Sequence, residues 1–149
     1  ELDKETGHLI LDRVLSTSTT YPHNYGFIPL TLASDKVPLD VLVVCSESIL
    51  PMSFVECKPI GVLTMDDNGV ADEKIIAVPL KDPFYAPFND FHELPSHIID
   101  EIKHFFCVYK TLEDKITAIE EVQDAEAAKA LISQCLERYN NIIKPKRNN

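Results

Sequence analysis

The hydrophobic residues change their spacing near residue 95, and this change constrains the fold more than any other feature of the sequence. Before it, short runs rich in Val, Ile and Leu are separated by Pro, Asp and Asn-Gly, a pattern typical of strands joined by turns. After it, apolar residues recur at helical spacing. The chain is therefore predicted to be α+β and mainly β, with its strands first and its helices last.

Four segments of the first part are predicted to be strands. They are residues 9–14 of HLILDRV, residues 40–44 (DVLVV), residues 54–65 (FVECKPIGVLTM) and residues 73–79 (EKIIAVP). Their even spacing favours a small mixed barrel over alternating βαβ units.

Two helices are predicted in the last third. The first begins after Pro95, with Ser96 as a candidate N-cap, and the second begins at Asp124. Each carries an apolar stripe that we expect to pack on the barrel. The ending KPKRNN is polar and is expected to fray.

Length and charge limit the possible classes of protein. The 149 residues suit a single domain over residues 1–149, and because the chain begins at Glu1 we expect an upstream segment to be missing. The net charge of −10 argues against a nucleic-acid partner and suits a protein that gathers cations. No apolar run reaches the roughly 20 residues of a membrane span and no signal-peptide pattern opens the chain, so we expect a cytoplasmic protein. Four widely spaced cysteines are expected to be reduced thiols.

Acidic residues cluster at two places where a loop meets a strand. Asp35 and Asp40 flank Pro38 in SDKVPLDVLVV, and Asp67 and Asp72 lie in MDDNGVADEK. Clustered carboxylates repel one another unless hard cations such as Mg²⁺ bridge them, so together they predict a multi-metal site. Ordinary solvated turns remain the alternative for each cluster, because Asp favours turns for backbone reasons, and Asp66 is assigned to the turn in either case.

Cationic and phenolic side chains occur near these acidic loops, and they are the donors that phosphate groups require. The set is Arg13, Tyr21, Tyr25, Lys74, Tyr109 and Lys110. The alternative is that they are surface charges and half-buried tyrosines. No P-loop, dinucleotide-binding or G-x-S-x-G motif is present, so nucleophilic catalysis has no candidate.

The combination YPHNYGFIP followed by Asp35-x-x-Pro38-x-Asp40 strongly resembles the soluble family I inorganic pyrophosphatases, in particular their plant-like branch, which also has bacterial members. The segments ELDKETGHLILDR, KPIGVLTMDDNGVADEKIIAVP and ELPSHIIDEIKHFFCVYK extend the similarity over most of the chain. The resemblance implies a five-stranded OB-like barrel with two flanking C-terminal helices. It also implies Mg²⁺-dependent hydrolysis of pyrophosphate to two phosphates, with several Mg²⁺ ions and direct attack by a metal-activated water. Bacterial relatives are often hexamers, so a homo-oligomer is expected, with a hexamer favoured.

The same resemblance assigns roles to individual residues. Asp35, Asp40 and Asp72 match metal ligands around the attacking water, and Asp67 with Asp72 matches ligands of further ions. The residues that match substrate contacts are Arg13, Tyr25, Lys74, Tyr109 and Lys110, and Glu1 matches an active-site acid.

Val37 departs from the pattern, because the family has a third Asp at this position as general base or orienting group for the water. A valine can accept no proton, and loss of a positioned base typically costs about 10²–10⁴-fold in rate. The sequence therefore leaves two main hypotheses: a pyrophosphatase impaired at Val37, or a weak or inactive relative that binds divalent cations, phosphate compounds or a protein partner. An acidic OB-like interaction module is a third possibility, which the retained acidic residues and Lys74 disfavour.

Overall fold

The computed structural model describes residues 1–3, 5–67, 69–115 and 117–144, and only the backbone of residue 67. The strands are β1 (Asn24–Phe27), β2 (Asp40–Val43), β3 (Cys57–Asp67), β4 (Val70–Pro79) and β5 (Thr117–Gln123). The helices are α1 (Ser96–Val108) and α2 (Ala125–Ile142), with two short 3₁₀ helices, η1 (Phe91–Glu93) and η2 (Thr111–Glu113). None of the described helices has the length and hydropathy needed to cross a membrane.

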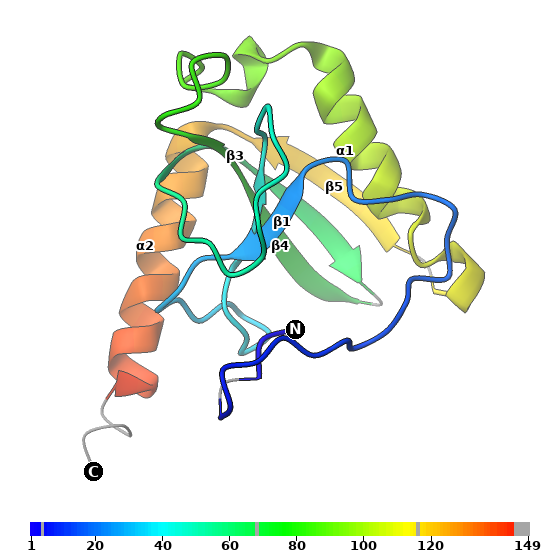
Figure 1. The fold of residues 1–149 in the computed structure, drawn as a ribbon, viewed down its shortest axis with the longest axis vertical. Coiled ribbons are helices and arrows are strands. Elements are labelled where there is room, and N and C mark those ends of the chain that lie inside the picture. The colour runs from blue at the N-terminus through cyan, green and yellow to red at the C-terminus, as the bar shows by residue number, and fades with distance from the viewer. Residues whose placement is uncertain (4, 68, 116, 145–149) are drawn as a thin grey trace.

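The five strands form one twisted mixed sheet in the order β1-β2-β4-β3-β5 (Figure 1). β2 and β4 run parallel, and the other neighbouring pairs run antiparallel. The α+β class is therefore confirmed, with the predicted numbers of strands and helices. β1 and β5 lie at opposite ends of the strand order, and no described ladder joins them. Closure into a barrel thus stays a prediction.

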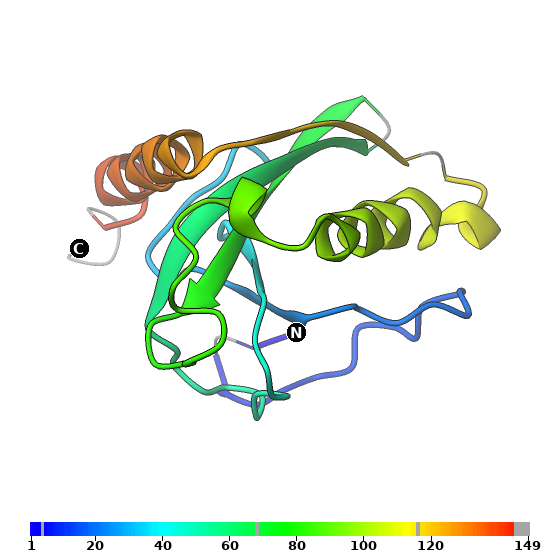
Figure 2. The ribbon, with the colours of Figure 1, turned by 90° about the horizontal axis from the view of Figure 1, so that it is seen from above.

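The two helices cover opposite faces of the sheet (Figures 1 and 2). Successive side chains of a strand point to opposite faces, and β3 shows this at its centre. Leu63 belongs to one buried cluster with Phe106 of α1, whereas Val62 belongs to a second cluster with Ala128 of α2. The centre of β3 is therefore apolar on both faces of the sheet.

The predicted strands at residues 40–44, 54–65 and 73–79 correspond to β2, β3 and β4. The predicted strand at residues 9–14 is wrong, because only an isolated bridge between Leu2 and Leu9 is present there. Leu11 and Val14 are about four-fifths exposed, since no described strand pairs with them. β1 and β5 were not predicted individually: β1 has only four residues, and β5 carries two adjacent glutamates.

The second helix begins as predicted, because the Asp124 carboxylate accepts a hydrogen bond from the Ala127 amide at 2.9 Å. The predicted cap of the first helix is wrong. Ser96 is the first helical residue, and Pro95 precedes it without a side-chain cap. Residues 145–149 of the ending KPKRNN lie outside the described residues, so its predicted fraying is not tested there.

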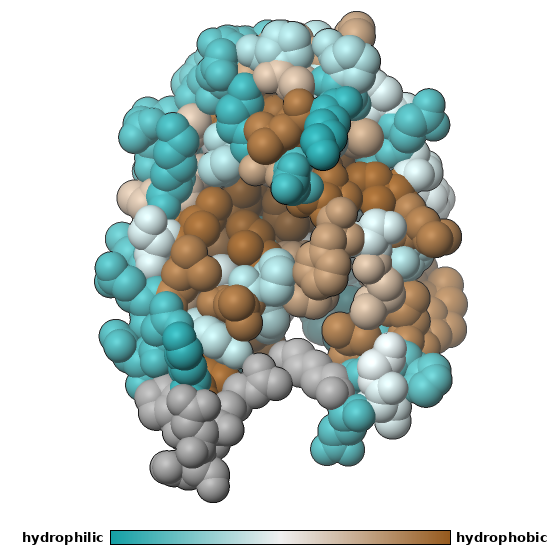
Figure 3. Space-filling model, turned by 60° about the vertical axis from the view of Figure 1, so that its left-hand side comes forward, coloured by the Kyte–Doolittle hydropathy of each residue, from teal (hydrophilic) through white to brown (hydrophobic). Residues whose placement is uncertain are grey.

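Apolar side chains also gather on the surface, around a hollow on the face that Figure 3 presents. In the loops that follow β2 and β4, Leu50, Phe54, Leu80 and Phe84 are all more than half exposed, and Phe54 is 93% exposed. These loops are neighbours, because the Leu80 amide donates to the Glu56 carbonyl at 2.9 Å. Exposed apolar area of this kind is typical of interaction surfaces.

Candidate active site

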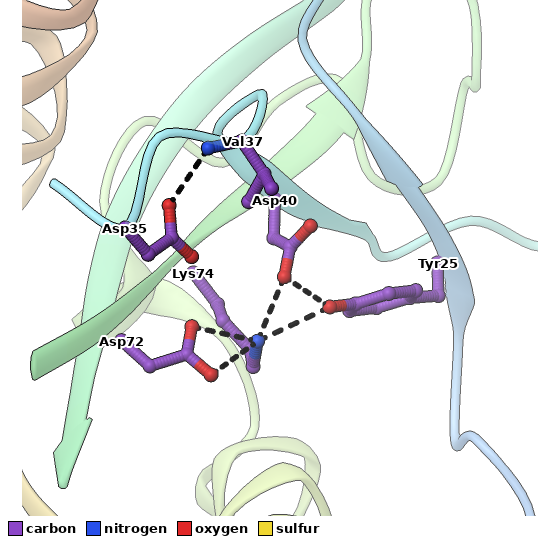
Figure 4. A network of polar contacts seen from close by, with 6 residues as sticks. All are labelled: Tyr25, Asp35, Val37, Asp40, Asp72 and Lys74. Atoms are coloured by element: carbon purple, nitrogen blue, oxygen red, sulfur yellow. Dashed lines mark hydrogen bonds and ion pairs between the residues drawn. The ribbon is translucent and has the colours of Figure 1, made fainter. Parts of the chain in front are cut away.

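One buried ammonium gathers four of the predicted site residues (Figure 4). The Lys74 Nζ lies 2.9 Å from Asp40 Oδ2, 2.9 Å from Asp72 Oδ1 and 3.1 Å from the Tyr25 hydroxyl. The Tyr25 hydroxyl in turn donates to Asp40. The network therefore joins side chains from β1, β2 and β4 around a single positive charge.

The sheet register places these side chains together. Asp40 at the start of β2 lies opposite Lys74 in the parallel pairing with β4. Asp72 and Lys74 are two residues apart on β4, so they share a face of the sheet. Tyr25 lies opposite Leu42, the residue two after Asp40, which makes Tyr25 a diagonal neighbour of Asp40 on that same face.

The electrostatics of the network favour a charged lysine. Burial lowers the pKa of Lys74, but its neighbours, including Asp40 and Asp72, raise that pKa by more, so it ends above its usual range. Burial raises the pKa of Asp72, and Lys74 only partly opposes the rise. Burial also raises the pKa of Tyr25, which keeps its phenol protonated as a donor. The result is an ammonium held by two carboxylates and a phenol.

Aromatic rings form a wall beside the ammonium. Lys74 Nζ lies 5.4 Å from the centroid of the Tyr25 ring and 5.2 Å from that of Phe106. Tyr21 stacks on Tyr25 with ring centroids 4.6 Å apart, and Tyr109 meets Phe106 edge-on at 5.6 Å. α1 thus reaches the ammonium through Phe106, and Tyr109, the residue that follows α1, packs against the Phe106 ring.

The turn before β2 carries Asp35 and Val37. The Val37 amide donates to Asp35 Oδ1 at 3.1 Å, and Lys36 between them adopts a left-handed φ of 72°. Figure 4 shows the Asp35 carboxylate on the side of Asp72 and Lys74, and its negative charge acts on Asp72. Val37 is half exposed and contributes no polar side-chain atom to this region.

Arg13 occupies a different environment from the network. Its guanidinium donates to Glu113 Oε2 at 2.6 Å, at the end of η2, and its side chain is 40% exposed. Lys115 lies 3.7 Å from the same Glu113 oxygen. Arg13 is thus held by a residue that is 100 positions away in the sequence.

The predicted site residues therefore divide into groups. Those that the structure brings together are Tyr25, Asp40, Asp72 and Lys74, with Asp35 and Tyr109 alongside. Lys110 lies with its Nζ 5.1 Å from the Tyr109 ring centroid. Glu1 is exposed, and its N-terminal ammonium group donates to the Ile10 carbonyl at 2.7 Å. In the described part of the chain, neither Glu1 nor Arg13 contacts the network. The Asp67 side chain lies outside the described residues.

The assignment of Asp66 to a turn is wrong for its backbone, because Asp66 lies in β3 and pairs with Ala71 of β4. Its side chain, however, serves the turn that follows. Its Oδ1 accepts the Gly69 amide at 2.6 Å, and Gly69 has a φ of 85°. Glycine adopts that left-handed conformation at little cost. Asp66 therefore supports the β3–β4 turn.

A metal site is supported by the kind of ligand present. Among the described side chains, no three Asp, Glu, His or Cys groups converge on one position. However, the carboxylate oxygens of Asp40 and Asp72 are the hard ligands that Mg²⁺ takes, and the Lys74 ammonium already lies between them as a cation. The type of ligand thus suits Mg²⁺, and in this structure both carboxylates are paired with the Lys74 ammonium.

Two neighbours of the predicted site were not identified from the sequence. Phe106 was assigned only to the apolar stripe of the first helix, and Glu113 was not singled out at all. Nothing local marks either residue, because each is recognisable only by its contact with a cation that is distant in the sequence. Phe106 is 32 residues from Lys74, and Glu113 is 100 residues from Arg13.

Comparisons with known proteins agree on one family. A family model described as inorganic pyrophosphatase matches residues 1–140. The chain is 46% identical over 147 residues to soluble inorganic pyrophosphatase 2 of Chlamydomonas reinhardtii, covering 99% of this chain and 77% of the relative. It is 48% identical over 139 residues to an inorganic pyrophosphatase of Halalkalibacterium halodurans, covering 93% and 85%. The solved structure of the Helicobacter pylori inorganic pyrophosphatase superposes with a TM-score of 0.90 at 40% identity, covering 94% and 84%.

Proposed function

The chain belongs to the soluble family I inorganic pyrophosphatases and is an inorganic diphosphatase, and on that premise we propose that the network around Lys74 is its active site. The single observation that supports this most directly is the buried ammonium between Asp40 and Asp72. It combines a donor for phosphoryl oxygens with ligands for the cations that pyrophosphate requires. The reaction is the attack of a water on one phosphorus of pyrophosphate, which releases two phosphates.

Substrate binding falls to the donors of the site. Lys74 supplies a charge, Tyr25 and Tyr109 supply phenol groups, and Lys110 and Arg13 supply further cations. Lysine acts on phosphate as a point charge, whereas arginine can form two parallel hydrogen bonds. Together they offset the negative charge that would otherwise repel an attacking oxygen. Glu1 is proposed as an additional acid at the edge of the site.

Magnesium is the proposed cofactor, with Asp35, Asp40, Asp67 and Asp72 as the residues that would hold it. Bound Mg²⁺ offsets the charge of pyrophosphate and lowers the pKa of water toward neutrality. The protein's own contribution is to fix where these residues lie: Asp40, Asp67 and Asp72 belong to β2, β3 and β4, and Asp35 belongs to the turn before β2.

Val37 is proposed to weaken the reaction. It lies between Asp35 and Asp40, where the family resemblance places a carboxylate that orients and deprotonates the water. A valine side chain can neither accept that proton nor hold the water by a hydrogen bond. We therefore expect turnover below that of relatives that carry Asp at this position.

The test is steady-state phosphate release from pyrophosphate with Mg²⁺, comparing the chain with Val37→Asp and Val37→Asn. Restoring the carboxylate should raise kcat by about 10²–10⁴-fold. Val37→Asn is the matched control, because it can hold a water but is a poor base, and it should recover much less. Equal activity in all three proteins would show that the reaction needs no base at position 37. If none of the three proteins released phosphate, the alternative would be favoured, namely a relative that binds divalent cations, phosphate or a protein partner.

We also propose that the protein is cytoplasmic and forms a homo-oligomer, with a hexamer favoured. The exposed side chains of Leu50, Phe54, Leu80 and Phe84 support self-association, because a monomer would leave them in water. Light scattering after gel filtration measures the mass directly. A monomer across the accessible concentration range would contradict the proposal.

A further inference from the structure

Phe106 contacts the site although it carries no polar group. Phe106 belongs to α1, and its ring centroid lies 5.2 Å from the Lys74 Nζ. The ring centroid of Tyr25, on β1, lies 5.4 Å from the same nitrogen. Lys74 is only 3% exposed and Phe106 only 1%. The ammonium therefore has two aromatic neighbours in addition to its carboxylates.

The Phe106 ring is held in place by other aromatic rings. Phe105 meets it at 5.1 Å and Tyr109 meets it at 5.6 Å, both edge-on, which is a favoured geometry for aromatic pairs. Tyr21 meets it edge-on as well, at 6.4 Å. A ring confined in this way cannot turn aside without disturbing α1.

We propose that Phe106 is a positioning residue, whose aromatic ring keeps the Lys74 ammonium pointed into the site through a cation–π interaction. The assignment goes beyond the donors and ligands named above. Its consequence for turnover rests on the proposed function, whereas its consequence for Lys74 itself does not.

The Lys74 ammonium needs another partner whenever its carboxylates bind a metal ion. Asp40 and Asp72 are the residues proposed to hold Mg²⁺, so their attraction for Lys74 weakens when they do. A lysine side chain is long, flexible and strongly hydrated, and without other partners it would turn toward water. An aromatic ring attracts a cation electrostatically and needs no ion of its own, so Phe106 can hold Lys74 whether or not the carboxylates are occupied.

Simple core packing is the competing explanation, since Phe106 belongs to the apolar stripe of α1. The two explanations differ in what they require of the ring. Packing depends on its shape and volume, whereas the cation–π interaction depends on the negative charge of its face. Fluorine substitution lowers that charge and changes the shape little.

The experiment replaces Phe106 with phenylalanines that carry one, two, three or five fluorine atoms on the ring. These noncanonical amino acids are introduced with an engineered tRNA and its synthetase. The same series at Phe88 is the matched control, because Phe88 packs against the same buried cluster and has no described contact with a lysine ammonium or with the Phe106 ring. Two quantities are measured for each protein. One is kcat/KM for pyrophosphate with Mg²⁺. The other is the rate at which the Lys74 ammonium protons exchange with water. It is measured by NMR on protein labelled with ¹⁵N-lysine, without Mg²⁺ or pyrophosphate, and the Lys74 signal is assigned by its absence from Lys74→Met.

We expect kcat/KM to fall stepwise with fluorine content at position 106, by roughly 5- to 30-fold for the full series, while the Phe88 series stays flat. Proton exchange at Lys74 should accelerate in parallel, again only for position 106. Equal behaviour of the two series, or no change in exchange at position 106, would overturn the proposal. If the unmodified protein proves unable to hydrolyse pyrophosphate, the exchange measurement alone decides, so failure of the proposed function and failure of this inference are distinguishable.

Discussion

Lys74 and Arg13 are both proposed to bind phosphate, yet the structure places them in opposite surroundings. The Lys74 side chain is 4% exposed on a central strand and has three hydrogen-bonding neighbours, whereas Arg13 is 40% exposed on an irregular segment and pairs mainly with Glu113. A cation that is buried among fixed partners keeps its position without substrate. A more exposed cation can change partners at small cost. If both residues bind phosphate as proposed, the site combines a fixed donor, Lys74, with a mobile one, Arg13.

The largest expected effect is that of Lys74→Met. Removing the ammonium leaves Asp40 and Asp72 close together and without a cation, and breaking a mostly buried ion pair in this way typically costs about 3 kcal/mol in the free energy of unfolding. Hydrolysis should be lost as well. Mg²⁺ should then raise the melting temperature of the variant by more than that of the parent protein, because no ammonium competes for the two carboxylates.

Lys81→Met is the matched control for that change. Lys81 is almost fully exposed and lies 3.8 Å from Glu56, so its loss should alter stability by no more than about 0.5 kcal/mol and leave Mg²⁺ stabilisation unchanged. Thermal and urea unfolding with and without Mg²⁺ measure both variants. An equal response to Mg²⁺ in Lys74→Met and its parent would mean that Lys74 does not compete with the metal.

Arg13→Gln should separate activity from stability. The Arg13 side chain is 40% exposed, so the loss of its pair with Glu113 should change stability by only about 1 kcal/mol. The loss of a charged donor to phosphate should lower kcat/KM by roughly 10- to 100-fold. Unfolding and steady-state kinetics on the same preparation make the comparison. A stability loss as large as that of Lys74→Met would remove the distinction between the fixed and the mobile cation.

Glu113→Gln should have the smallest effect, and it should strengthen substrate binding rather than weaken it. The carboxylate competes with substrate for the Arg13 guanidinium, so neutralising it should lower KM for pyrophosphate by about 2- to 5-fold. High ionic strength should diminish the difference, because exposed pairs are screened. A higher KM in the variant would instead show that Glu113 holds Arg13 in its productive position.

The sequence predicted those parts of the fold that depend on local patterns. The strand at residues 40–44 and the start of the second helix at Asp124 both have a local cause, and both predictions were confirmed. The segment at residues 9–14 has the alternation of a strand, but a strand also needs a neighbour, and the sequence does not say whether one is present. β5 was missed for the converse reason, because its pairing with β3 compensates for a polar composition.

The candidate site shows the same limit. The spacing of Asp35 and Asp40 and the spacing of Asp72 and Lys74 are local, so the sequence identified these residues as possible ligands and donors. The contact between Asp40 and Lys74 depends on strand register, and the contacts of Phe106 and Glu113 depend on where α1 and η2 lie. Without a structure, no local rule connects those residues to a cation.

The parallel pairing of β2 with β4 has a consequence for how the protein folds. Asp40 and Lys74 face one another across this pair although they are 34 residues apart in the chain. The whole of β3 lies between them in sequence, and it pairs with β4 but not with β2. Contacts between distant residues form slowly, because the entropy of closing the loop must be lost first. The ammonium network should therefore be among the later features to appear on the folding pathway, and a chain emerging from the ribosome gains its complete charge arrangement only when the central pair of strands has closed.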